Sequence, residues 1–207
     1  MSGDLRVCFF GDSFVQGIGD PDYRGWVGRV LAVTGPDVTA FNLGVRRDTS
    51  DDVVRRYRQE LDARTVADAD NRLVVSFGSN DAIEENGRVR VELSRCVDNL
   101  AGMIAESRDR QLSMLVVGPP PVLDAGAAHL ERTMKIAAEM AALCAVDDVP
   151  FVDITAALAA DPAWIAEVTA GDGAHPGRGG YERLTALVLD AGWRAWLGGR
   201  AGRPAAR

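Results

Sequence analysis

The chain has 207 residues, a length that suits one domain with a substantial hydrophobic core. Hydrophobic residues make up 47% and charged residues 26% of the sequence, which is the balance of an ordinary globular protein. The formal net charge of -7 argues against electrostatic attraction to nucleic acid or to anionic lipid. The first residues show no signal peptide and no membrane span is visible, so we expect a cytoplasmic protein.

Short apolar runs with the character of buried strands alternate with stretches of helical periodicity. In chain order, the predicted strands lie near residues 5–10, 37–43, 72–77, 112–117 and 149–154. The predicted helices cover residues 25–33, 51–67, 89–110, 127–145 and 180–197. This alternation predicts right-handed βαβ crossovers and a parallel sheet that is covered on both faces. We therefore expect an α/β protein, a three-layer α/β/α sandwich with a five-stranded parallel sheet in the flavodoxin-like order 2-1-3-4-5.

One domain is predicted to span residues 1–197. Residues 198–207 are rich in Gly, Ala and Arg without an apolar period, and we predict a disordered C-terminal tail there. Cys8, Cys96 and Cys144 are widely spaced in apolar stretches and show no metal-ligand or redox spacing, so they are predicted to be buried free thiols. No metal or cofactor is expected, and the sequence leaves the oligomeric state open.

Polar residues follow the first three predicted strands. The first strand runs into a loop that contains Ser13, the second into a loop that begins at Gly44, and the third into Gly-Ser-Asn-Asp, which contains Asn80. A serine beyond the carboxyl end of a buried strand lies at the rim of the sheet, where open α/β folds bind ligands. The simpler interpretation of Ser13 is a helix N-cap. Both roles are compatible, because a helix N-terminus beside the serine also supplies backbone N–H groups.

The chain has two histidines, so few side chains are candidates for a general base. His129 lies in an Ala-rich run that predicts the solvated first turn of a helix, and we interpret it as an exposed or capping residue. His175 lies in a loop bounded by Gly and Pro, three residues after Asp172. Asp172 can accept from one ring nitrogen and leave the other free to take a proton. A backbone carbonyl is an alternative orienting group for His175.

Taken as a set, these blocks resemble the SGNH hydrolases, the GDSL esterase and lipase family. The marked residues of that family fall on Ser13, Gly44, Asn80 and His175, in the family's order. The resemblance implies a serine hydrolase that cleaves carboxylic esters through an acyl-enzyme, with a triad of Ser13, His175 and Asp172. It also implies an oxyanion hole made by the N–H groups of Ser13 and Gly44 and the side-chain amide of Asn80. A small or short-chain ester is the implied substrate, and a thioester is a further option.

Four further residues adjoin the predicted site. We expect Asp12 and Asp81 to accept hydrogen bonds from loop N–H groups rather than to transfer protons. Trp26 either lines the pocket or anchors the first helix in the core. Arg46 either binds an anionic part of a substrate or stays solvated.

Other functional classes fit the sequence less well. A receiver-like signalling domain shares the strand order, but it needs an acidic cluster after the first strand, where Asp12 stands alone. A flavin-binding module needs a phosphate loop rich in Ser, Thr and Gly at the place where this chain has Asp12 and Phe14. Two alternatives stay open: an acyltransferase that uses the same site, and a non-catalytic binding protein on the hydrolase scaffold.

Overall fold

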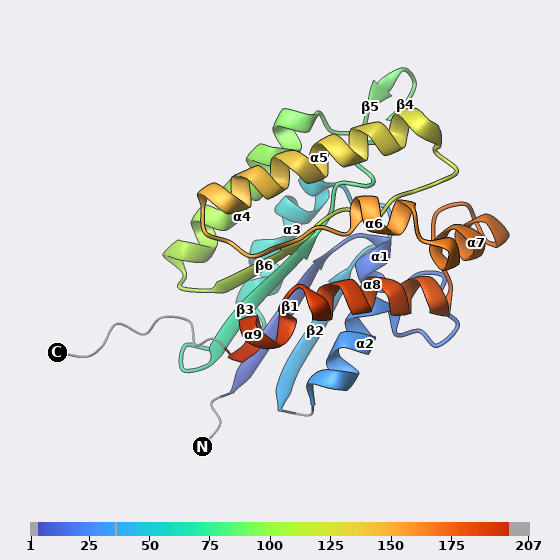
Figure 1. Cartoon of the computed structure of the whole chain (residues 1–207). Helices are drawn as coiled ribbons and strands as arrows, with labels where there is room; N and C mark the ends of the chain where they lie inside the picture. Colours follow the sequence, from blue (N-terminus) through green and yellow to red (C-terminus); the bar gives the residue numbers. More distant parts are fainter. Residues whose placement is uncertain (1–3, 36, 199–207) are drawn as a thin grey trace.

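A five-stranded parallel sheet forms the centre of the computed structural model, which describes residues 4–35 and 37–198. Its strands are β1 (Leu5–Gly11), β2 (Val38–Gly44), β3 (Asp70–Ser76), β6 (Ser113–Val117) and β7 (Phe151–Val152). The spatial order is β2-β1-β3-β6-β7, which confirms the predicted order 2-1-3-4-5. Because the strands are parallel, their carboxyl ends point to one end of the molecule (Figure 1). Apart from Gly198, the predicted tail at 198–207 lies outside the described residues.

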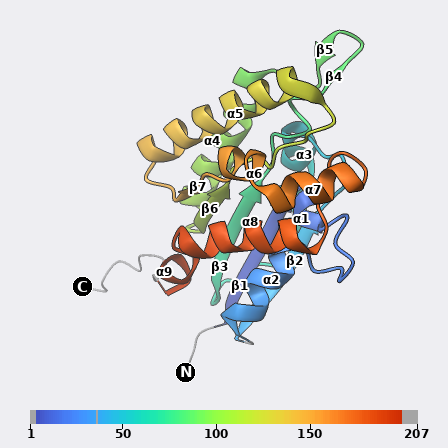
Figure 2. The ribbon, with the colours of Figure 1, turned by 45° about the vertical axis from the view of Figure 1, so that its right-hand side comes forward.

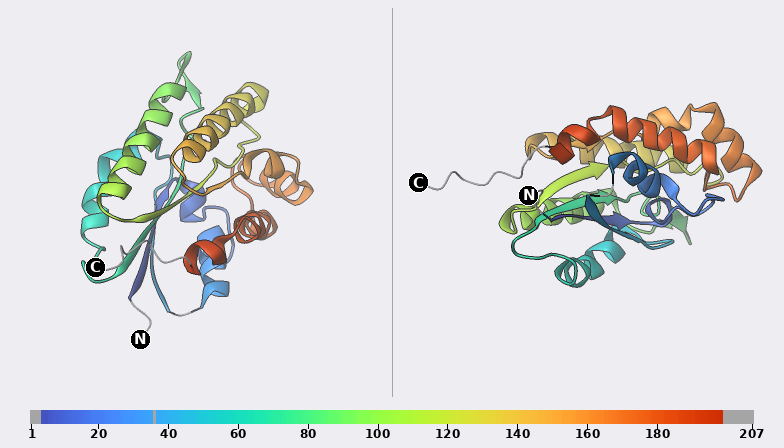
Figure 3. Two further views of the ribbon diagram at one scale, coloured as in Figure 1. Left: turned by 60° about the vertical axis from the view of Figure 1, so that its left-hand side comes forward. Right: turned by 90° about the horizontal axis from the view of Figure 1, so that it is seen from below.

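Helices cover both faces of this sheet, as predicted. One face carries α1 (Ser13–Gln16), α2 (Gly25–Thr34), α6 (Thr155–Ala159), α7 (Pro162–Ala170), α8 (Arg178–Asp190) and α9 (Trp193–Gly198). The other face packs against α3 (Ser50–Asp62), α4 (Leu93–Asp109) and α5 (Gly126–Val146). In the right-hand view of Figure 3, α8 lies above the sheet and α3 below it. None of the helices in the described part of the chain has an apolar stretch long enough to cross a membrane.

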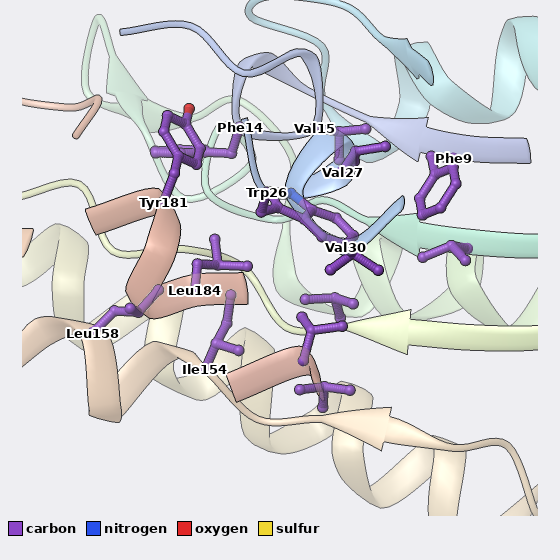
Figure 4. Close-up of a cluster of buried hydrophobic side chains, with 14 of the residues drawn as sticks. Phe9, Phe14, Val15, Trp26, Val27, Val30, Ile154, Leu158, Tyr181 and Leu184 are labelled. Atoms are coloured by element: carbon purple, nitrogen blue, oxygen red, sulfur yellow. The ribbon is translucent and has the colours of Figure 1, made fainter. Parts of the chain in front are cut away.

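The alternation of side chains along β1 divides the core into two clusters. Val7 and Phe9 belong to the cluster under α2 and α8, whereas Cys8 and Phe10 belong to the cluster under α3 and α4. Figure 4 shows the first cluster, which contains Phe9 and Trp26. The two rings meet edge to face, with centroids 5.8 Å apart, and Trp26 is 0% exposed. Trp26 therefore anchors α2 in the core and does not line a pocket.

The predicted final helix over 180–197 is two helices. α8 ends at Asp190 and α9 begins at Trp193, because Gly192 between them adopts a φ of 102°. This left-handed conformation ends a helix and is accessible to glycine without strain. The segment 155–170, for which no element was predicted, forms α6 and α7. The sequence does carry a local signal for the start of α7. Asp161 accepts from two N–H groups of the first turn of this helix, and a proline follows at the first helical position.

A short hairpin of β4 (Glu84–Glu85) and β5 (Arg88–Val89) was also not predicted. Its turn is formed by Asn86 and Gly87, which both have positive φ, at 55° and 77°. The helix predicted from residue 89 therefore begins only at Leu93. The hairpin stands at the same end of the molecule as α1 and α7 (Figures 1 and 2).

All three cysteines are free and buried, which confirms the prediction from their spacing. Burial raises the pKa of Cys8 to about 11 and the pKa of Cys144 to about 12. The pKa of Cys96 is also raised by burial, with a further contribution from the nearby Asp81 charge. These thiols are therefore protonated and unreactive at neutral pH.

Replacing Trp26 tests the packing of the first cluster. Trp26→Ala should lower the free energy of unfolding by about 3 to 5 kcal/mol, the usual cost of removing a buried large aromatic side chain. Trp26→Phe should cost less than half as much, because it keeps an aromatic ring against Phe9 and removes an indole N–H that has no partner among the described residues. Urea denaturation measures both values, and equal losses in the two variants would contradict this assignment.

Candidate active site

The site is built where three neighbouring strands end. Gly11, the last residue of β1, pairs with Gly44 of β2 on one side and with Ser76 of β3 on the other. A Cβ atom on Gly11 would lie 2.1 Å from the Ser76 carbonyl oxygen, so only glycine permits this close approach. The three loops that follow these strands therefore start side by side at the rim of the sheet.

Asp12, not Ser13, caps the first helix. Asp12 Oδ1 accepts from the Phe14 N–H at 2.9 Å, and α1 begins at Ser13. The Ser13 hydroxyl is therefore not used as a cap. Ser13 is only 4% exposed. It lies at the amino end of α1, directly beyond β1.

A continuous chain of hydrogen bonds joins Ser13 to the last loop of the domain. Ser13 Oγ lies 2.7 Å from His175 Nε2, and His175 Nδ1 lies 2.7 Å from Asp172 Oδ2. The other oxygen, Asp172 Oδ1, accepts from the N–H groups of His175 and Ala174 at 2.8 and 3.1 Å. Although burial raises the pKa of Asp172, these hydrogen bonds outweigh it and lower the pKa to about 2. Asp172 is therefore a full negative charge at neutral pH.

Neighbouring loops hold His175 in place. Its ring packs against Phe14, with centroids 5.1 Å apart, so the residue after Ser13 supports the imidazole. The Asp124 N–H donates to the Gly173 carbonyl at 3.0 Å, which ties the His175 loop to the segment after β6. The side chain of His175 is 8% exposed, whereas that of Asp172 is 46% exposed. The His175 imidazole is therefore enclosed, while the Asp172 carboxylate is open to water.

Asn80 reaches the same rim from the loop after β3. Its Nδ2 donates to the Asp48 carbonyl at 3.0 Å and lies 3.4 Å from Asp12 Oδ2. Asn80 is 8% exposed. The amide is thus held between the residue before Ser13 and the loop after β2.

Gly44 lies at the end of β2, and its expected role as an oxyanion donor stays a prediction. In this structure its N–H already has an acceptor, Asn42 Oδ1, at 3.0 Å. A Cβ atom at Gly44 would lie 2.2 Å from the Gln16 nitrogen, which shows that glycine is needed here for α1 to pack on the end of β2. Asn42 also donates to the Val15 carbonyl at 2.8 Å. Sequence reasoning missed Asn42, although an amide inside the apolar run of β2 was a signal.

The expectation that His129 is exposed is wrong. His129 is 1% exposed, and its Nε2 lies 2.9 Å from the Ser79 carbonyl oxygen, one residue before Asn80. The first turn of α5 packs against the loop after β3 instead of facing solvent, and burial lowers the pKa of His129. His129 is therefore a neutral residue that supports the Asn80 loop. It does not contact Ser13 Oγ, whose hydrogen-bond partner is His175.

Three carboxyl groups lie around Asn80; those of Asp12 and Asp81 are buried, and that of Asp48 is partly buried. Asp12 is 0% exposed, and burial, together with the Asp81 and Asp48 charges, raises its pKa to about 7 against the opposing effect of the Phe14 N–H. Asp81 accepts from the N–H and the hydroxyl of Ser50, and burial raises its pKa. Asp48 is paired with a half-buried arginine of α3, and burial raises its pKa as well. The Asp172 carboxylate is thus charged at neutral pH, whereas the Asp12 carboxyl beside Ser13 titrates near neutral pH.

Arg46 lies at the open edge of this arrangement. Its Nη2 is 3.7 Å from Asp172 Oδ2, and its side chain is 58% exposed. It is thus neither buried against the sheet nor directed away from the site.

Comparison with known proteins agrees with this geometry. Residues 9–183 match the model of the GDSL-like lipase/acylhydrolase family, which is most of the chain. The chain belongs to this family. The resemblance to the SGNH and GDSL hydrolases is therefore confirmed.

Three relatives show how far the similarity extends. The uncharacterized protein YpmR of Bacillus subtilis (strain 168) is 32% identical over 85 residues, which cover 39% of this chain and 33% of YpmR. The alignment thus spans only about a third of that relative. A lipase/acylhydrolase from Enterococcus faecalis is 25% identical with a TM-score of 0.69, and 90% of this chain and 94% of that one are covered. A catalytic mutant of the acetylxylan esterase Axe2 from Geobacillus stearothermophilus has a TM-score of 0.75 at 16% identity, with 99% of each chain covered, which shows a shared fold.

Replacing Asp12 by asparagine should change how stability depends on pH. The pKa of Asp12 is raised from 3.8 to about 7 by folding, so the folded state holds an additional proton between these values. The favourable contribution of the neutral carboxyl is therefore fully present below pH 3.8 and is lost as the pH rises towards about 7. Asparagine keeps the cap but does not titrate. The stability of Asp12→Asn relative to the wild type should increase from pH 4 to pH 7 in urea unfolding, and a constant difference would contradict the raised pKa.

Proposed function

We propose that this protein is a serine hydrolase that cleaves carboxylic esters, with Ser13 as the nucleophile. The observation that carries the proposal is the continuous chain from Ser13 Oγ to His175 Nε2 and from His175 Nδ1 to Asp172 Oδ2, with 2.7 Å at each contact. A serine hydroxyl is a weak nucleophile at neutral pH and needs an adjacent base that a third group orients. These three residues supply each of those parts.

In the proposed reaction, His175 takes the hydroxyl proton as Ser13 Oγ attacks the ester carbonyl. The pKa of Asp172 is lowered to about 2, so this carboxylate stays ionised and stabilises the imidazolium that forms. His175 then returns the proton to the leaving alcohol, and the acyl group remains on Ser13. A water molecule that His175 deprotonates releases the acid and restores the serine.

The oxyanion of the tetrahedral intermediate needs donors that are already in place. The Ser13 N–H is the first of α1 and has no acceptor within that helix. The Asn80 amide lies at the same rim as a neutral donor, and its contact with Asp12 Oδ2, at 3.4 Å, is long enough for this N–H to turn to the oxyanion instead. We assign the third donor to the Arg47 N–H, because the N–H groups of Val45, Arg46 and Asp48 already have acceptors in the described structure. Arg47 has a φ of 72°, and its loop contacts Asn80 through the Asp48 carbonyl.

The surroundings of His175 support small or short-chain acyl groups and water as the acceptor. Phe14 packs against His175 on one side and stacks on Trp164 on the other, with ring centroids 5.9 Å apart. Because these rings occupy the interior beneath His175, we place only a small or short acyl group there. The 46% exposure of the Asp172 side chain leaves this part of the site wet, which favours hydrolysis over acyl transfer to an alcohol.

Hydrolysis of p-nitrophenyl esters from acetyl to palmitoyl tests this function. The wild type should release p-nitrophenol from the short-chain esters, and both Ser13→Ala and His175→Ala should lose at least about 10³ in kcat because the nucleophile or its base is absent. His129→Gln is the matched control for the second histidine. It should retain turnover, since the glutamine amide can keep the contact with the Ser79 carbonyl that supports the Asn80 loop, and His129 has no contact with Ser13. Hydrolysis that survives in Ser13→Ala would refute the proposed nucleophile.

Asn80→Ala tests the oxyanion hole separately from the triad. Loss of one preorganised donor should reduce kcat by about 10²- to 10³-fold. KM should change little, because the hydrogen bond is made mainly in the transition state. Circular dichroism and urea unfolding should show that the variant stays folded. Full turnover in a folded Asn80→Ala protein would remove Asn80 from the oxyanion hole.

A further inference from the structure

The backbone of Arg46 is hydrogen-bonded to α1, the helix that begins at Ser13. The Arg46 N–H donates at 2.9 Å to Oε1 of Gln16, which is the last residue of α1, and Ser13 is the first. From there its guanidinium reaches the edge of the site, where Nη2 lies 3.7 Å from Asp172 Oδ2. The side chain nevertheless remains 58% exposed. A cation is thus held close to the nucleophile without being buried.

Asp172 satisfies Arg46 only weakly. Asp172 Oδ2 already lies 2.7 Å from His175 Nδ1, and Oδ1 accepts two backbone N–H groups. The 3.7 Å contact to Arg46 is longer than a charge-assisted hydrogen bond of about 2.7 to 2.9 Å. A pair with both side chains about half exposed also adds little stability. The guanidinium therefore keeps most of its N–H donors available to a ligand.

Two other arginines around this edge are more closely paired. Arg178, at the start of α8, lies 2.8 Å from Asp22, and Arg47 lies 3.0 Å from Glu85 of the hairpin. Arg178 has the same exposure as Arg46, at 58%. The two arginines therefore differ in how tightly a carboxylate holds them and not in their access to solvent.

We propose that Arg46 selects esters that carry a carboxylate within a few bonds of the scissile ester, an inference that rests on the proposed esterase function. The planar guanidinium matches a carboxylate through two parallel N–H···O bonds. Arg46 contacts the Asp172 carboxylate, and only the imidazole of His175 separates that carboxylate from Ser13 Oγ. One small molecule can therefore span Arg46 and Ser13. The net charge of -7 disfavours the approach of anions, and a cation at the rim offsets that repulsion locally.

Two matched pairs of esters test the selection. In the first pair, 4-acetoxybenzoate and its methyl ester differ by a carboxylate on the leaving group. In the second, p-nitrophenyl hydrogen adipate and p-nitrophenyl hexanoate differ by a carboxylate on the acyl chain. For at least one pair, Arg46→Gln should reduce the ratio of anionic to neutral kcat/KM by roughly tenfold, the effect of one charge-assisted hydrogen bond. The neutral ester should change by less than about twofold, and Arg46→Lys should keep part of the preference.

Arg178→Gln is the control, because it removes an equally exposed arginine that Asp22 already pairs. It should leave the ratio unchanged. An equal fall of kcat for the neutral and the anionic ester in Arg46→Gln would mean that Arg46 positions Asp172, and would overturn the proposal. An unchanged ratio in both pairs would overturn it as well.

Calorimetry on Ser13→Ala separates this inference from the proposed function. That variant should bind 4-acetoxybenzoate more tightly than its methyl ester, and the added Arg46→Gln substitution should remove the difference. Binding that follows this pattern, together with a wild type that hydrolyses no ester, would refute the esterase and retain Arg46 as an anion-recognition residue. Equal binding in this pair, and equal binding of p-nitrophenyl hydrogen adipate and p-nitrophenyl hexanoate as well, would refute the role of Arg46 whatever the activity of Ser13.

Discussion

The register of the parallel strands at the end of β1 is the constraint on which the site depends. Gly11 lies between Gly44 and Ser76, so three chain segments leave the sheet at the same level. The Arg56 guanidinium reinforces this point from α3 by donating to the carbonyls of Gly11 and Leu43 at 3.2 and 2.8 Å. The serine turn and the two flanking loops therefore start from one rigid platform, which fixes their relative positions better than independent loops would.

His175 reaches this platform from outside the sheet and is positioned in a different way. His175 belongs to a loop between two helices, where the Asp172 carboxylate binds the backbone of its own loop and the Phe14 ring supports the imidazole. The pKa values of two carboxyl groups close to Ser13 are shifted in opposite directions. The pKa of Asp172 is lowered to about 2, and that of Asp12 is raised to about 7. Environment alone thus makes Asp172 a permanent charge near pH 7 and Asp12 a group that gains or loses its proton near that pH.

The sequence was sufficient for the sheet, its strand order and the residues of the hydrogen-bonded chain. Ser13, Asp172 and His175 stand out because each lies in a polar loop next to apolar elements whose period is clear. The features that sequence reasoning missed depend on distant packing. Whether His129 is buried depends on the loop after β3, and whether the Gly44 N–H is free depends on a neighbouring amide. The break in the final helix and the hairpin at Asn86 and Gly87 depend on single left-handed residues, which a periodic pattern does not register.

The three buried cysteines also bear on how the site can be studied. Alkylating reagents attack the thiolate, and in Cys8, Cys96 and Cys144 burial raises the pKa and blocks access. The folded chain therefore presents no competing target to a maleimide dye. Tyr23 is 93% exposed in the loop that follows α1, the helix of Ser13. A cysteine introduced there would carry a single fluorophore on that loop. The natural sequence thus already serves as a background for site-specific labelling, and ligand arrival can be followed by fluorescence without removing any native thiol.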